Sequence, residues 1–479
     1  MNCEGKCSGC TGKKCGEYRE LPGPKSKAIK EDLFRYESGG TFWRVTNDSA
    51  DRIPVYEKME GLRMWDVDGN EYIDTYGQFA ASCLGHAPMQ LIDAVTDQMK
   101  TLMHVSGDTP NVPRAQLVKR LVEEVAPGDM RGDAKVQFEL GGSGAVELAL
   151  QIAEYAQPDP QNDFISFFGA YHGRSTAALT VAPNIYFRDR LPTMAQKVTR
   201  VPYAYCYRCH YGLEYPSCDM YCVKYLKKLF ESPEYGIYDP ATRTNSIAAV
   251  IVEPAQFHTG GIYPPAEFIQ GIREVCDQYG LIMIDDEIAV GMGRSGKWWC
   301  MENYGVTPDL ITTSKAISGG VWPLSAVIGK SSVMKTWDEH PDKHMGTWHG
   351  NAVGARAALT VIDEIQKNGY LEKNAEHGRY FLDGLEQIKK NHRMVGDVQG
   401  IGLGLSLEMV RDKKTKEPAE PETIAVIRKA LEYGMTICRA AYYGNRMTFM
   451  PGYIVTNADI DLMLDIVDRC ISEVEAGDF

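Results

Sequence analysis

The chain has 479 residues, 44% of them hydrophobic, and a net charge of −13. This length exceeds what one hydrophobic core usually supports, which predicts two or more domains, and the negative charge argues against a nucleic-acid partner. No apolar run reaches the roughly 20 residues of a membrane-spanning helix and the first residues lack the apolar core of a signal peptide, so we expect a cytoplasmic protein without a membrane partner.

Residues 1–20 form a cysteine-rich N-terminal extension with Cys3, Cys7, Cys10 and Cys15. The C-x3-C-x2-C spacing of the first three is found among iron–sulfur ligands, and Cys15 could be a fourth ligand. Unligated thiols are the alternative. We interpret this extension as an addition to an enzyme and not as its active centre.

A β-hairpin is predicted within residues 61–77, because two strand-like segments flank the turn pair Asp68-Gly69. We assign residues 21–85 to the N-terminal part of a small domain.

Short apolar runs alternate with helical patterns from about residue 135 to 330. The runs AAVIVE and LIMIDD are apolar almost throughout, which is typical of strands buried on both faces of a parallel sheet. The predicted fold class is α/β, with a mainly parallel, doubly wound sheet in a large domain, residues 86–350. A smaller α+β domain would be built from both chain ends and would include residues 351–479. Ligands of such sheets bind at the carboxyl ends of strands.

Two turns at predicted strand ends could contact a ligand. In LGGSGAVE, Gly142 and Ser143 begin a helix, where backbone amides can bind a phosphate. An ordinary strand–helix turn is the alternative. In FGAYHGRS, Tyr171 and His172 follow an apolar strand, and the aromatic ring could stack on a flat ligand or pack in the core.

The next two strands end in a carboxylate and a lysine. Asp286 and Glu287 end the buried strand in LIMIDDEIAVGMGRSG, and buried carboxylates are costly unless a positive partner faces them. Lys315 ends the strand in LITTSKAISGG. A low-dielectric pocket disfavours the ammonium form of a lysine, which makes a neutral amine available for Schiff-base chemistry.

This combination resembles the class III aminotransferases, pyridoxal 5′-phosphate (PLP) enzymes of fold type I. The resemblance extends from about residue 40 to the C-terminus. Its strongest motifs are IVEPAQ, IDDEIAVGMGRSG, SKAISGG and GTWHGN, the last being similar to the family's GTFGGN.

The resemblance implies a role for each matching residue. Lys315 would hold PLP and move a proton, and Asp286 would keep the pyridine nitrogen protonated so that the ring is an electron sink. Thr347 would reach the phosphate bound by a neighbouring subunit, which implies a homodimer or a dimer of dimers. Glu253 matches a glutamate that often pairs with a pocket arginine. Further cofactor contacts are expected from Gly142, Ser143, Gly144, Tyr171, His172 and Ile288.

Three positions depart from the family pattern. Gly144 stands where the family usually has an acid, and Ala289 replaces a glutamine whose contact with the cofactor Gln256 could supply. Thr448 stands where many members have an arginine that binds the substrate's α-carboxylate. Either Arg446 binds the carboxylate from a shifted position, or the substrate has no free carboxylate there.

A second cysteine group, Cys206, Cys209, Cys218 and Cys222, lies in a predicted insertion, residues 203–225. Its C-x2-C-x8-C-x3-C spacing suits tetrahedral zinc, and unligated thiols are the alternative.

The predicted function is transfer of an amino group from an ω- or β-amino acid, an amine or a β-aminoacyl thioester such as a coenzyme A ester. Pyruvate or 2-oxoglutarate would be the keto-acid acceptor. A PLP-dependent racemase, aminomutase or lyase on the same scaffold is the alternative. A non-catalytic metal-binding scaffold is a third interpretation, which intact Lys315 and Asp286 disfavour.

Overall fold

The computed structural model describes residues 12–38, 52–158, 161–184, 197–341, 343–440 and 442–477. The predicted ligands Cys3, Cys7 and Cys10 lie outside these ranges, whereas Cys15 packs, partly buried, against the largest core. Among the described residues, no helix is long and apolar enough to cross a membrane.

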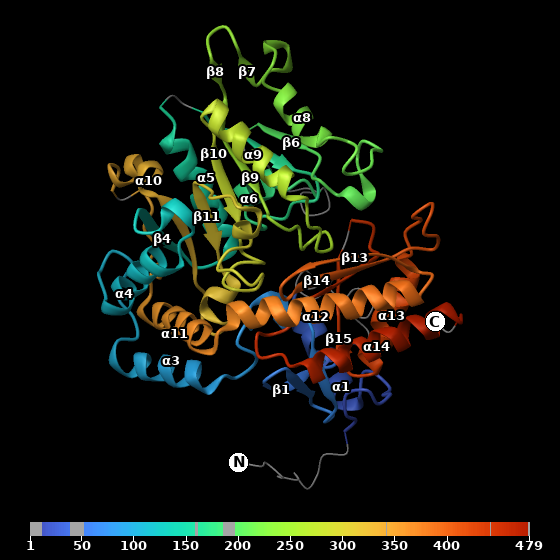
Figure 1. The fold of residues 1–479 in the computed structure, drawn as a ribbon. Helices are drawn as coiled ribbons and strands as arrows, with labels where there is room; N and C mark the ends of the chain where they lie inside the picture. Colours follow the sequence, from blue (N-terminus) through green and yellow to red (C-terminus); the bar gives the residue numbers. More distant parts are fainter. Residues whose placement is uncertain are drawn as a thin grey trace.

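A seven-stranded mixed sheet lies at the centre of the α/β region (Figure 1). β12 runs antiparallel to both of its neighbours, and the other paired strands are parallel. The predicted α/β class is confirmed. The reversed strand is not visible in the sequence, because a buried antiparallel strand is as apolar as a parallel one. The strands are, in spatial order, β4 (Ala134–Glu139), β12 (Ser325–Lys330), β11 (Leu310–Thr313), β10 (Ile282–Asp286), β9 (Ile247–Val252), β5 (Asp163–Phe167) and β6 (Val198–Val201).

Helices cover both faces of this sheet, and β9 shows why its sequence is apolar throughout. Ala249 and Ile251 pack with residues of α5, α6 and α10 on one face. Val250 and Val252 pack with residues of α8 and α9 on the other. The bounds of these helices are α5 (Gly142–Ala156), α6 (Thr176–Val181), α8 (Tyr221–Lys228), α9 (Ala266–Tyr279) and α10 (Ser331–Asp338).

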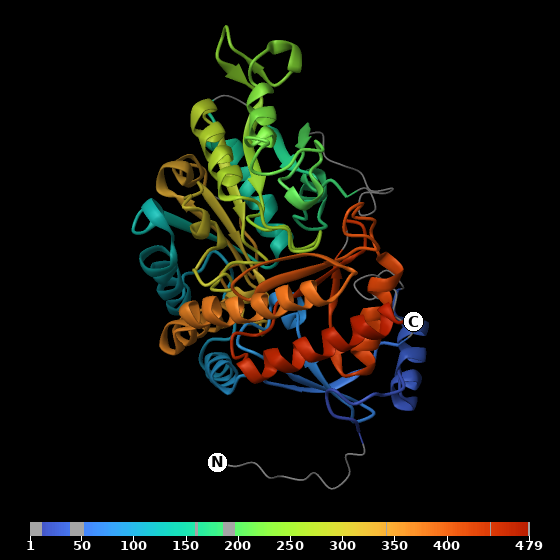
Figure 2. The same ribbon diagram turned by 45° about the vertical axis from the view of Figure 1, so that its right-hand side comes forward.

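A smaller sheet joins segments from both chain ends. The predicted hairpin is confirmed, because β2 (Arg63–Asp66) pairs antiparallel with β3 (Glu71–Asp74). β1 (Tyr56–Glu60) extends it on one side, and the C-terminal strand β15 (Met435–Thr436) pairs parallel with β3 on the other. Figure 2 shows the N-terminal strands, in blue, beneath the C-terminal helix α14, in red. The domain boundaries themselves stay a prediction.

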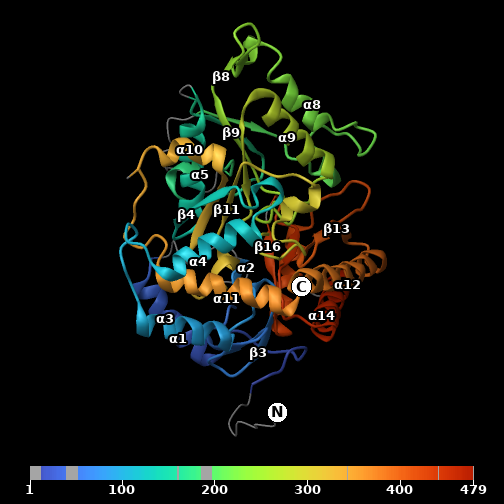
Figure 3. The same ribbon diagram turned by 60° about the vertical axis from the view of Figure 1, so that its left-hand side comes forward.

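A third, antiparallel sheet consists of β13 (Val395–Ile401), β14 (Gly404–Met409), β17 (Arg446–Phe449) and β16 (Cys438–Ala440). α12 (Tyr370–Asn391) packs against β13 and β14. α11 (Ala352–Asn368) packs against α3 (Met89–Thr101), α4 (Val112–Arg120) and the short turn Lys315–Ser318 (Figure 3), so a long helix supports the turn that carries Lys315. The remaining elements are α1 (Pro24–Tyr36), α2 (Gly77–Ala80), β7 (Tyr238–Asp239), β8 (Thr244–Asn245), α13 (Glu420–Glu432) and α14 (Asn457–Glu475).

Candidate active site

Lys315 and Asp286 lie at the carboxyl ends of two neighbouring parallel strands. Asp286 ends β10 and lies in register with Thr312 of β11, and Lys315 follows the end of β11 by two residues. Lys315 has a φ of +50°. This left-handed conformation costs a non-glycine residue about 1–2 kcal/mol, and such strain is kept where the fold holds a side chain in one place.

The Asp286 carboxylate is buried and held by three groups. Nδ1 of His172 lies 2.7 Å from Oδ2. The backbone N–H of Ile288 and the hydroxyl of Thr312 each donate to Oδ1 at 3.2 Å. These three contacts hold both carboxylate oxygens in place.

Burial shifts the pKa values of Lys315 and Glu253, whose charges interact with the Asp286 carboxylate. Desolvation lowers the pKa of Lys315, and the charges of Asp286 and Glu253 oppose that shift. Burial raises the pKa of Glu253 well above its usual range, and the neighbouring Asp286 charge adds to the rise. The Tyr171 backbone N–H donates to Oε1 of Glu253 at 2.8 Å. The lysine amine is therefore easier to deprotonate than in water.

The turn from β4 into α5 can accept a phosphate. Gly141 is the N-cap of this 15-residue helix, so its first turn presents backbone amides with no side-chain cap. A Cβ added at Gly142 would lie 3.0 Å from Cδ1 of Ile288, which leaves little space for a larger residue. Oγ of Ser143 accepts a hydrogen bond from the backbone N–H of Arg174 at 3.1 Å.

Tyr171 stacks on His258, with ring centroids 4.5 Å apart and an angle of 29° between the planes. The histidine thus covers one face of the tyrosine ring. Burial lowers the pKa of His258 to about 4, and the positive charges of Arg174 and Lys315 contribute. Arg174 therefore belongs to the same site. Sequence reasoning missed it, although it follows Tyr171 by only three residues.

Glu139 explains the departure at Gly144. A Cβ at residue 144 would lie 2.7 Å from Oε2 of Glu139. The same carboxylate lies 3.0 Å from Nε2 of His344 and 3.4 Å from Nε2 of His349, both in the segment that contains GTWHGN. A local sequence pattern could not predict this contact, because about 200 residues separate Glu139 from the two histidines.

Gln256, the expected substitute for the glutamine missing at Ala289, already has partners. Its Nε2 donates to the Phe168 carbonyl at 3.0 Å, and its Oε1 accepts from the Thr259 hydroxyl at 3.3 Å. Its side chain holds the segment before Tyr171 in place.

Arg446 and Thr448 both lie on β17 and are fully buried. The Arg446 guanidinium pairs with Glu408 at 2.5 Å and with Asp397 at 3.2 Å, and it donates to Ser406 at 2.6 Å. Thr448 instead lies in register with Cys438. Burial raises the pKa of Cys438 to about 11, and Thr448 and the Lys315 charge oppose the rise, so both neighbour that thiol. The Thr448 hydroxyl donates to the Cys438 carbonyl at 3.4 Å, whereas the Arg446 guanidinium is held by its own ion pairs.

Thr347 is exposed in the single chain. The neighbouring Trp348 is 49% exposed and packs on His104, with ring centroids 4.3 Å apart.

The four cysteines of the predicted insertion follow the edge strand β6 and line a separate cavity.

These residues fit PLP, which is the cofactor of class III aminotransferases. A helix N-terminus suits the phosphate, an aromatic ring the pyridine face, a buried carboxylate the ring nitrogen, and a lysine of lowered pKa the aldehyde.

Comparison with known proteins agrees with this geometry. The family model "Aminotransferase class-III" matches residues 45–471. A leucine/methionine racemase of Thermococcus litoralis is 31% identical, over 88% of this chain and 91% of the relative. A taurine–pyruvate aminotransferase of Bilophila wadsworthia is 29% identical, over 93% of this chain and 98% of the relative. An (S)-enantioselective ω-transaminase from Thermomicrobium roseum has a similar structure, with a TM-score of 0.84, 26% identity and coverage of 95% and 100%.

The family model spans most of the chain, and the solved transaminase shares its fold over nearly its whole length. The resemblance seen in the sequence motifs is thereby confirmed. The chain belongs to the class III aminotransferases and is a PLP-dependent enzyme of that family.

Proposed function

We propose that the protein transfers an amino group from an ω- or β-amino acid, an amine or a β-aminoacyl thioester to pyruvate or 2-oxoglutarate. The observation that carries this proposal is the place of Lys315, whose amine lies beside the buried carboxylates Asp286 and Glu253 at the strand ends. Bound PLP supplies an electron sink for the substrate carbon.

Residues of the chain bind the cofactor and move the proton. Asp286, fixed by His172 and Thr312, holds a proton on the ring nitrogen. Lys315, with its lowered pKa, takes a proton from the substrate carbon and returns it to another position. Gly142 and Ser143 bind the phosphate through backbone amides, which fixes the ring for that proton transfer.

Thr448 supports a donor without an α-carboxylate at that position. A threonine hydroxyl carries no charge, and Arg446 is already paired with Glu408 and Asp397. A carboxylate facing Thr448 would be buried without an arginine partner, which is costly. ω-Amino acids, amines and masked amino acids avoid that cost.

Arg174 is our candidate for the acid group of the acceptor or of an ω-amino acid. Its backbone N–H donates to Oγ of Ser143 in the phosphate turn, and its charge acts on His258, which stacks on Tyr171. An arginine there can bind a carboxylate in a bidentate fork.

Three variants, one of them a control, test these assignments. Thr448→Arg should lower kcat/KM for the best donor at least about tenfold, or 1.4 kcal/mol, and should improve use of simple α-amino acids. Thr448→Val, which also lacks a charge, should leave that preference unchanged. Arg174→Gln should raise KM for the keto acid with little change in kcat. If Thr448→Arg changes neither donor class, the assignment of Thr448 is wrong.

A second candidate function, amino-acid racemisation, is favoured by the racemase relative from Thermococcus litoralis. Both reactions begin by removing a proton from the same carbon. They differ in one requirement, since a transaminase needs a keto acid in stoichiometric amount and a racemase needs none.

A homodimer is part of the proposal. Thr347 and several apolar side chains are exposed in the single chain, and such a surface is typical of a subunit interface. The exposed side chains lie on α3, in the segment just after it, on α4 and around Thr347: Met89, Met99, Met103, Val112, Met345 and Trp348. If Thr347 binds the partner's phosphate, dilution to monomers should release PLP. A monomer that keeps both PLP and activity in sedimentation and kinetic assays contradicts this assignment.

A further inference from the structure

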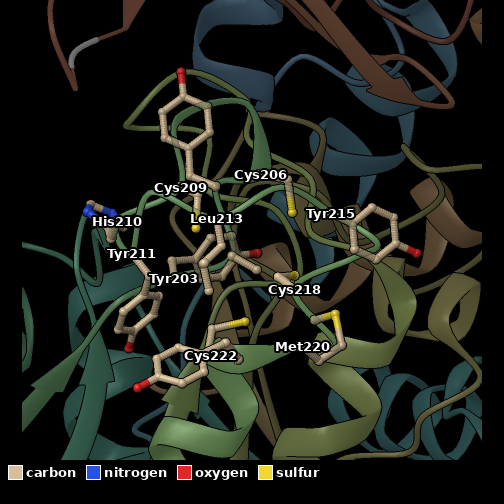
Figure 4. Close-up of a pocket in the computed structure, with 13 residues that line it drawn as sticks. Tyr203, Cys206, Cys209, His210, Tyr211, Leu213, Tyr215, Cys218, Met220 and Cys222 are labelled. Carbon is tan, nitrogen blue, oxygen red and sulfur yellow. The ribbon is translucent and has the colours of Figure 1, made fainter.

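The cysteine-rich insertion brings four thiols to one cavity that the proposed reaction does not use. Cys206, Cys209, Cys218 and Cys222 line a cavity of about 20 Å³ (Figure 4). Most of the remaining wall consists of tyrosine side chains. A cavity needs about 10–15 Å³ to hold a water molecule, so this one has room for a single small ion.

Two tight turns supply the thiols. Cys206 begins a 3₁₀ turn, Cys206–Arg208, and Cys209 follows it directly. Cys218 precedes α8, and Cys222 lies in its first turn. Between them, Asp219 and Met220 have φ values of +48° and +49°. Each costs about 1–2 kcal/mol in a non-glycine residue, so another interaction must hold this turn.

Few apolar contacts order this segment: Tyr207, Met220 and Cys222 pack, only partly buried, against the core that includes α9. No residue from 206 to 222 is buried, and the apolar anchors Val223 and Leu226 come only in α8. Small segments of this kind usually need a disulfide or a metal ion to stay folded. All four cysteines are free thiols in the structure, so disulfides do not fill that role.

We propose that Cys206, Cys209, Cys218 and Cys222 bind one zinc ion in a closed, tetrahedral structural site. Each thiol gives its proton to solvent as its Zn–S bond forms, and no electron is transferred. The cavity suits one ion better than an iron–sulfur cluster. Across the described residues, three potential ligand atoms lie within 4.8 Å of one another only at Glu139, His344 and His349. The four sulfurs must therefore move inward to reach Zn–S distances of about 2.3 Å.

The site would connect the insertion to the active-site walls. Nε of Arg208 lies 2.5 Å from Oε1 of Glu408, the partner of Arg446. His210 lies 3.0 Å from the Tyr442 hydroxyl and packs edge-on against Phe168, which precedes the segment carrying Tyr171. Zinc would thus fix the turn that carries Arg208 and His210. This turn contacts Glu408 through Arg208, and it contacts Tyr442 and Phe168 through His210.

The test is metal analysis of the full-length, PLP-loaded enzyme produced with added zinc. We expect about one zinc ion per chain, and X-ray absorption should show four sulfur ligands at about 2.3 Å. Cys209→Ser with Cys218→Ser should lose the ion and lower the thermal unfolding temperature. Cys276→Ser, which alters a buried thiol of α9 outside this cavity, is the matched control and should retain zinc.

Several results would overturn the proposal. They are wild-type enzyme without zinc, zinc retained by the double variant, and zinc lost from Cys7→Ser with Cys10→Ser. Iron with acid-labile sulfide would replace zinc by a cluster and also refute it. X-ray absorption needs only the wild type, so poor folding of a variant leaves the test intact. PLP content is measured on the same samples. Loss of zinc with PLP retained bears on the zinc proposal alone, and loss of PLP bears on the proposed catalytic function.

Discussion

The variant Arg446→Met tests whether Arg446 stabilises the fold or binds the substrate. The methionine retains much of the side chain's volume and removes its charge. Arg446 donates to the Gly260 carbonyl at 2.8 Å and to Ser406 at 2.6 Å, and it pairs with Glu408 and Asp397. All four partners lose a donor in the variant.

Removing one member of a buried ion pair usually costs about 3–5 kcal/mol. Glu408 keeps Arg208 at 2.5 Å and Asn445 at 3.2 Å in the variant, so its charge is not left unpaired. We therefore expect a loss near the lower limit, about 3 kcal/mol in the free energy of unfolding. Arg208→Met removes the more exposed guanidinium from the same carboxylate and is the matched control, with a smaller loss.

Urea unfolding gives the stability, and steady-state kinetics at a temperature where the variant is folded gives KM for the keto acid. The structure predicts a large change in stability and a KM within about threefold of wild type, less than 1 kcal/mol. Unchanged stability with a hundredfold loss in kcat/KM for carboxylate substrates would refute this reasoning. Arg446 would then be the carboxylate anchor.

Three further predictions concern the strand ends. Lys315→Ala should abolish turnover, and borohydride should no longer fix PLP to the chain in mass spectrometry; near-wild-type activity contradicts the assignment. Asp286→Asn should lower kcat about a thousandfold, or about 4 kcal/mol of barrier, with PLP still bound; a rate within tenfold of wild type sinks the electron-sink role. Burial raises the pKa of Glu287 to about 8, so the stability that its protonated form contributes is present in acid and is lost as pH rises through 8. Glu287→Gln, which stays neutral, should therefore show a melting temperature that varies less between pH 5 and 9, and a profile identical to wild type would contradict the shift.

The sequence predicted best what depends on local pattern. The apolar runs of β9 and β10 predicted buried parallel strands, and Asp68-Gly69 predicted the hairpin of β2 and β3. The order of Asp286 and Lys315 along the chain placed both at strand ends, because consecutive parallel strands end at the same edge of the sheet. That edge is where the structure has them.

Contacts between distant segments could not be predicted in this way. The sequence left two alternatives open: a carboxylate bound by Arg446 from a shifted position, or a substrate without a free carboxylate there. The buried Glu408, which pairs with Arg446 in the structure, lies 38 residues before it and could not be identified as its partner from the sequence. Glu139 and its histidines escaped notice because nothing in either segment alone requires the other.

One assay tests the central claim most directly. The enzyme is incubated with ω-amino acids, amines and β-aminoacyl thioesters, each with and without pyruvate, and alanine and the remaining donor are quantified. The account predicts one alanine for each donor consumed and no lasting turnover without the keto acid. Interconversion of L- and D-amino acids at an undiminished rate in the absence of any keto acid would contradict it, and the protein would then be a racemase.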